Sequence, residues 1–165
     1  MKRRKFLILG SLLGVPSWGV SRAISPFNME ITELIGAVQE HLFPEGSQVP
    51  SAKSMDAIGY LVKAITHKSY NKEQRNHLVV GAQKLAKQTE KKFMLLSSHE
   101  KENVLRRYAM SKEGHDWLQQ ILFLTMEALF SDPLYGSNIQ ASGWKALHTQ
   151  GGSPRPKKRY IYESI

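Results

Sequence analysis

Apolar residues recur at helical spacing along almost the whole chain after residue 25. Ile31, Leu34, Ile35, Val38 and Leu42 occupy positions i, i+3, i+4, i+7 and i+11, which lie on one face of a helix. No stretch shows the sustained alternation of apolar and polar residues that marks a half-buried strand. The pattern therefore predicts an all-α fold, a single irregular bundle of about five helices that follows an N-terminal signal segment.

Helix breakers and capping residues divide the pattern into segments. The predicted helices are one near residues 28–42, one from Met55 to near Lys68, one from about Asn71 with Leu78, Ala82, Leu85 and Thr89 inward and Phe93 as its closing residue, one that starts at Ser97, and one after Ser111. Ser97 and Glu100 have the spacing of a capping box. The last helix is the most apolar, so we expect it to be central, with Trp117 in the core.

Charge is concentrated at the two ends of the chain. The net charge is +9, but residues 1–23 hold five basic and no acidic residues, which leaves 18 basic against 14 acidic ones. Residues 155–159 form a second basic cluster, so the central part is close to neutral. A broad basic face for phosphates is therefore not predicted, and neither is binding to nucleic acid.

Several kinds of catalytic or cofactor site lack their usual residues. The chain has no cysteine, which excludes disulfides, thiolate zinc sites, cysteine-ligated iron–sulfur clusters and covalent c-type haem. Its six histidines form no His-Glu-x-x-His motif, and no Gly-x-Gly-x-x-Gly motif lies between a strand and a helix. His115 and Asp116 are neighbours, but adjacent helical positions point apart. We therefore assign no catalytic, cofactor-binding or metal site to this chain.

Residues 1–23 have the three parts of an export signal: a basic head, an apolar run over residues 6–20, and small residues before a cleavage point at Ala23. The pair Arg3-Arg4, with Phe6 and Leu7 shortly after it, resembles a twin-arginine signal, which exports folded proteins. The alternatives are an ordinary export signal and a membrane anchor that is not cleaved. We divide the chain into this signal, a helical domain over residues 24–150 and a basic flexible tail over residues 151–165, whose solvated form we favour over contact with lipid or a partner.

A loop with defined backbone roles follows the last helix. Asp132 can bond a backbone N–H two residues on, and Pro133 cannot continue a helix. Gly136 permits a positive φ, and Asn138 tolerates the left-handed region. Trp144 follows this loop, where it either covers the bundle or fills a pocket in a partner.

The residue identities here resemble a known family. The segment Phe123 to Asn138 with its Asp-Pro-x-Tyr-Gly-x-Asn motif, Gly143-Trp144 after it, the Leu42-Phe43-Pro44 stop and the Arg-Arg-Lys-Phe-Leu start are similar to the gluconate 2-dehydrogenase subunit 3 family. The likeness spans nearly the whole chain. It implies a small helical subunit without catalysis of its own.

The resemblance also implies partners. In that family the small subunit accompanies an FAD-dependent dehydrogenase of the glucose-methanol-choline type, often with a cytochrome c subunit that carries haem, and its signal takes the folded pair through the twin-arginine translocase. We therefore expect a periplasmic protein, membrane-associated through the complex or through an uncleaved signal. The residues assigned to the partner interface are Asp132, Pro133, Tyr135, Gly136, Asn138 and Trp144. The alternative is a freestanding exported helical binding or scaffold protein.

Overall fold

The computed structural model describes residues 27–158, and this part of the chain is built from helices and turns without a strand. The α-helices are α1 (Met29–Leu42), α2 (Ala57–Thr66), α3 (Lys72–Ala86), α4 (Ser98–Ala109), α5 (Lys112–Phe130) and α6 (Ser142–Ala146). Three short 3-10 turns, η1 (Phe93–Leu95), η2 (Pro133–Tyr135) and η3 (Ile139–Ala141), lie between them. The all-α fold is confirmed. The five residues assigned to the export signal, Arg3, Arg4, Phe6, Leu7 and Ala23, lie outside the described residues.

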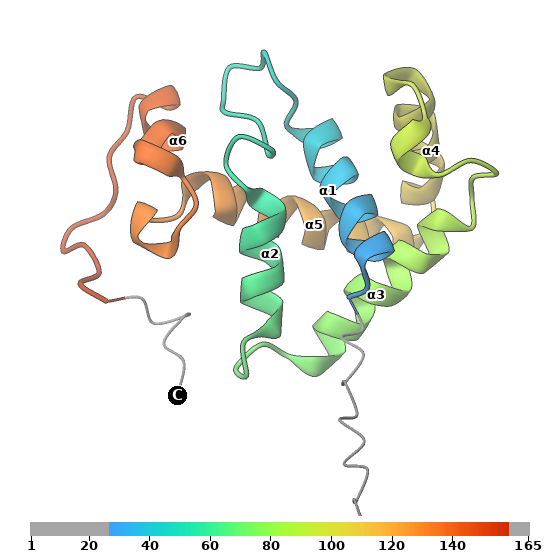
Figure 1. Ribbon diagram of the computed structural model, residues 1–165, viewed down its shortest axis with the longest axis horizontal. Coiled ribbons are helices and arrows are strands. Elements are labelled where there is room, and N and C mark those ends of the chain that lie inside the picture. The colour runs from blue at the N-terminus through green and yellow to red at the C-terminus, as the bar shows by residue number, and fades with distance from the viewer. Residues whose placement is uncertain (1–26, 159–165) are drawn as a thin grey trace, which may run out of the picture.

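Helix α5 is the centre of the bundle. It contacts α1, α2, α3 and α4, and Figure 1 shows it running behind α1 and α2. The short helix α6 lies at one side of the bundle, and α4 lies at the other (Figure 1). The expected central position of this helix is therefore confirmed, although α2 is more apolar per residue. None of the helices within residues 27–158 is long and apolar enough to cross a membrane.

Trp117 of α5 fixes the contact between α5 and α3. Its side chain is fully buried, and its Nε1–H donates to the carbonyl oxygen of Leu78 at 2.9 Å. Tyr108 packs edge-on against the Trp117 ring, with 5.7 Å between ring centroids, and its hydroxyl donates to the carbonyl oxygen of Gly81 at 2.9 Å. Both aromatic side chains therefore bury their apolar area while their polar groups are bonded. The prediction that Trp117 lies in the core is confirmed.

The predicted helix starts at Ser97 and after Ser111 are also confirmed. The Ser97 hydroxyl accepts the Glu100 N–H at 3.3 Å, and the Glu100 carboxylate accepts the Ser97 N–H at 2.7 Å. The Ser111 hydroxyl accepts the Gly114 N–H at 3.0 Å at the start of α5. These contacts satisfy backbone donors that the first turn of a helix leaves without partners.

The expected end of the third helix was wrong. Helix α3 ends at Ala86, and Phe93 belongs to the separate turn η1, which contacts α1. A continuous helix would have carried Phe93 about 12 Å along the axis beyond Leu85. The turn instead returns Phe93 to the core, where it is buried. The second helix is also shorter than expected, because Asp56 caps it and Met55 lies before its start.

The approach of α3 to α5 generates a prediction about Gly81. A Cβ atom on Gly81 would lie 1.9 Å from Cδ1 of Trp117, whereas a Cβ atom on Gly36 of α1 would lie 3.6 Å from the nearest atom, in Ile58. We expect Gly81→Ala to lower the free energy of unfolding by about 1–3 kcal/mol through overpacking. The matched variant Gly36→Ala should raise it by up to about 1 kcal/mol, because alanine favours a helix. Urea unfolding followed by circular dichroism measures both, and equal effects would contradict this account.

Candidate functional site

The loop that follows α5 is held by the local contacts expected for it. The Asp132 carboxylate accepts the Leu134 N–H at 2.9 Å, and Pro133 begins the turn η2. Gly136 has φ +86° and Asn138 has φ +50°, both in the left-handed region. All four predicted backbone roles are confirmed, so the loop has a defined shape before any partner is present.

Asn138 is the buried centre of this loop. Its side chain is fully buried; Nδ2–H donates to the carbonyl oxygen of Ser131, and Oδ1 accepts the Gly143 N–H, each at 2.8 Å. A Cβ atom on Gly143 would lie 2.0 Å from the carbonyl oxygen of Leu129, so only glycine allows this approach. Asn138 therefore joins the start of the loop to the start of α6. Any contribution it makes to an interface comes through the shape of the loop, because its side chain is out of a partner's reach.

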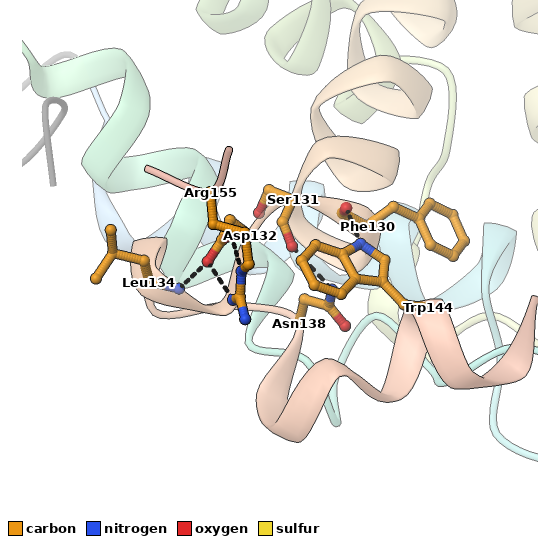
Figure 2. A network of polar contacts seen from close by, with 7 residues as sticks. All are labelled: Phe130, Ser131, Asp132, Leu134, Asn138, Trp144 and Arg155. Carbon is orange, nitrogen blue, oxygen red and sulfur yellow. Dashed lines mark hydrogen bonds and ion pairs between the residues drawn. The ribbon is translucent and has the colours of Figure 1, made fainter. Parts of the chain in front are cut away.

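Trp144 covers the C-terminal end of α5. Its Nε1–H donates to the carbonyl oxygen of Phe130 at 2.6 Å, and its side chain is half-buried. Figure 2 shows this bond beside the contacts of Asp132 and Asn138. Of the two roles expected for Trp144, covering the bundle is the one that its contacts within the chain support.

Arg155 of the tail binds the loop. Its Nε–H and Nη2–H donate to the two carboxylate oxygens of Asp132, both at 2.9 Å (Figure 2). The guanidinium group also lies over the Trp144 ring, 5.3 Å from the centroid, a distance at which a cation is attracted to an aromatic face. The expectation of a solvated tail missed this contact. The flexibility of the tail stays a prediction.

The pair lowers the pKa of Asp132. The hydrogen bond from Arg155 is the main cause and the Leu134 N–H adds to it, while partial burial acts in the opposite direction. A carboxylate with a lowered pKa in the folded state stabilises the fold above its unfolded pKa, and this contribution is lost as the pH falls through the folded value. At neutral pH the Asp132 carboxyl group is therefore ionised and able to accept both hydrogen bonds from Arg155.

A groove of about 600 Å³ separates the loop from the returning tail. Among its lining residues are Phe130, Asp132, Tyr135, Trp144 and Leu147. Three of the six predicted interface residues, Asp132, Tyr135 and Trp144, therefore line this groove. Asn138 is buried and does not line it, and Pro133 and Gly136 belong to the turn η2 and its C-cap.

Two further residues, Leu147 in the lining of the groove and Arg155 bonded to Asp132 beside it, were not assigned to the interface by the sequence analysis. Leu147 could have been found from its spacing of three residues after Trp144, which places both on one face of a short helix. Arg155 has no such local signal, because it is 23 residues away from Asp132.

Outside this loop, the ionisable side chains of Asp116 and His41 pair with other side chains of the bundle. Asp116 pairs with Lys112 at 2.6 Å rather than with its neighbour His115, as the helical geometry predicts. His41 of α1 contacts Glu102 of α4 at 2.9 Å. Between residues 27 and 158, no three His, Cys, Asp or Glu side chains gather in a way that could hold a metal ion.

The arrangement of side chains around the groove is suited to recognition of another surface by shape and apolar contact.

Comparison with known proteins gives one match. The family model described as gluconate 2-dehydrogenase subunit 3 matches residues 30–152, which include every helix from α1 to α6 almost completely. No curated protein and no solved structure matches the chain.

The two hydrogen bonds of the Asn138 side chain generate a prediction. We expect Asn138→Gly to lower the free energy of unfolding by about 2–4 kcal/mol, because the Gly143 N–H and the Ser131 carbonyl lose their partner. Asn138→Ala should cost about 1 kcal/mol more, because alanine disfavours a positive φ. Gln140→Gly is the matched control: Gln140 is exposed with φ +56°, so this change should be neutral or stabilising. Thermal unfolding measures all three, and a loss of stability in the control equal to that of Asn138→Gly would contradict the role of the side chain.

The Arg155 contact generates a second prediction. We expect Arg155→Gln to raise the pKa of Asp132 part of the way to its ordinary value, because the Leu134 N–H remains. Lys157→Gln removes a neighbouring charge that makes no ion pair among residues 27–158 and should leave this pKa almost unchanged. A pH titration of the Asp132 carboxyl group by NMR distinguishes the two variants. Equal pKa changes would mean that the tail acts only through its overall charge.

Proposed function

The chain belongs to the gluconate 2-dehydrogenase subunit 3 family, and from this membership we propose that it is the non-catalytic small subunit of a flavin-dependent sugar or polyol dehydrogenase complex. The single observation that carries the proposal is the family match over residues 30–152. In this proposal the FAD belongs to a glucose-methanol-choline-type partner subunit, and haem c belongs to a third subunit where one is present. The small subunit stabilises the flavoprotein.

The fixed conformation of the loop after α5 supports a role in binding. Asn138, Asp132 and Trp144 each bond other parts of the same chain, so the loop does not have to be ordered when a partner binds. Association is favoured when the conformational entropy of a binding loop has already been lost on folding. The loop and the groove beside it therefore offer a ready surface for the flavoprotein.

The proposed second task is export. Arg3 and Arg4, with Phe6 and Leu7 behind them, would direct the chain to the twin-arginine translocase, and Ala23 would precede the cleavage point. A flavoprotein binds its cofactor as it folds, so it needs a pathway that accepts folded cargo. One signal on the small subunit would then deliver both chains to the periplasm.

Co-expression with a candidate flavoprotein subunit of the glucose-methanol-choline type tests both tasks. We expect the two subunits to co-purify from the periplasm, and we expect Arg3→Lys with Arg4→Lys to retain both in the cytoplasm, because the translocase requires the arginine pair. Arg22→Lys is the matched control, since it makes the same exchange in the signal outside the pair. Immunoblots of the two fractions measure the distribution.

Two results would contradict the proposal. If the flavoprotein reaches the periplasm with the arginine pair replaced, the export task is wrong. If the purified mature chain does not bind the flavoprotein at all, the chain is the freestanding exported helical protein.

A further inference from the structure

The outward face of α5 carries large apolar side chains that nothing in the described part of the chain covers. Leu122, Phe123 and Met126 are 39%, 64% and 44% exposed, although the opposite face of α5 is buried against four helices. In Figure 1, α1 and α2 lie in front of α5, and no helix of residues 27–158 is seen behind it. Large exposed apolar groups that are contiguous mark interaction sites more often than isolated ones do.

This face continues into the groove. Phe123, Met126 and Phe130 have i, i+3 and i+7 spacing, so they share one side of the helix. Phe130 also lines the groove together with Leu147, which is 51% exposed. We call these five residues, Leu122, Phe123, Met126, Phe130 and Leu147, the α5–α6 surface. Its ionisable neighbour on the helix is Glu127, a half-buried side chain that interacts with Tyr70.

The two ends of this surface differ in charge. At the α6 end, Lys145, Lys157 and Lys158 are exposed, and none forms an ion pair within residues 27–158. At the other end, Glu113 pairs with Lys84 at 2.7 Å and Asp116 pairs with Lys112 at 2.6 Å. Each acidic group at that end therefore has a basic partner within the chain, whereas the three lysines of the α6 end are available to attract an acidic surface.

We propose that the α5–α6 surface binds the dehydrogenase subunit through a patch with an apolar centre and acidic residues beside the α6 end. This inference rests on the proposed function and names the surface by which the complex forms. The three lysines at the α6 end, unpaired within the described residues, favour a partner with acidic residues there over a second copy of this chain. A second copy packed antiparallel through α5 would bring the three lysines to Glu113 and Asp116, whose charges are already paired.

The shape of the surface favours a protein over a lipid bilayer. The apolar face ends in a hollow of about 600 Å³, which a protruding side chain of a protein can fill. A buried aromatic or aliphatic side chain in such a pocket is the usual centre of a protein interface. Phe123 would be the corresponding anchor on this chain, because it is the most exposed member of the surface.

The test measures binding of the mature chain to the purified flavoprotein subunit by surface plasmon resonance. The double variant Phe123→Ser with Met126→Ser should bind about tenfold more weakly or worse, because it removes the apolar centre. The matched control is Leu95→Ser with Met110→Ser, which removes two apolar side chains that are 75% and 88% exposed on η1 and at the end of α4. The control should bind within about twofold of the original chain. Circular dichroism checks that both variants are folded.

Charge is tested in the same assay. Replacing Lys145, Lys157 and Lys158 by Glu should slow association, and the association rate of the original chain should fall as salt is added, because screening weakens attraction between exposed charges. Equal rates for both chains at low salt would overturn the charge argument.

The remaining outcomes separate this inference from the proposed function. If the original chain does not bind the flavoprotein, the proposed function fails. If it binds and the Phe123/Met126 variant binds equally well, the surface is wrong and the function stands. A variant that still binds the flavoprotein but loses self-association in sedimentation, or loses binding to phosphatidylglycerol vesicles, would assign the surface to a second copy or to lipid and would also overturn the proposal.

Discussion

The position of α5 depends on the space that Gly81 leaves for Trp117. Because Gly81 has no side chain, the Trp117 ring reaches the backbone of α3 and bonds the Leu78 carbonyl from within the core. This contact fixes the rotation of α5 about its own axis. Rotation decides which residues face inward, so it also decides that Phe123 and Met126 face outward. The same orientation buries Ile121, Ala128 and Leu129 of α5 together with Trp117.

The end of α5 is organised by contacts that reach progressively farther along the chain than those within a helix. Asn138 ties the Ser131 carbonyl to the Gly143 N–H, and Trp144 returns to the Phe130 carbonyl. Arg155 then brings the tail to Asp132. The bonds of Asn138 span 7 and 5 residues, that of Trp144 spans 14, and that of Arg155 spans 23. These bonds fix the positions of the loop, α6 and the tail, and the groove is the space left between them. Glycine at position 143 allows the backbone at the start of α6 to approach the Leu129 carbonyl oxygen.

Sequence patterns predicted the features that depend on neighbours within a few residues. The capping box at Ser97, the cap at Ser111 and the turn at Asp132 are contacts between residues two or three positions apart, and these could be predicted. The return of Phe93 to the core, the approach of Gly81 to Trp117 and the bond from Arg155 to Asp132 could not. They join segments whose relative positions are set only when the whole bundle packs, and no local spacing records them.

The candidate interface illustrates the same limit. Asp132, Asn138 and Trp144 were distinctive in sequence because the loop needs them, and their polar groups are occupied within the chain. Residues that can contact a partner were harder to recognise, because Leu122, Phe123 and Met126 resemble ordinary core positions of an apolar helix. A helix that is apolar around most of its circumference is normally buried on all sides. In this bundle α5 is buried on one side, and its outward side carries Leu122, Phe123 and Met126, which the proposed contact with the dehydrogenase subunit would cover. The distinctive residues thus maintain the shape of the loop, and the contact area that we propose consists of residues without a distinctive sequence signal.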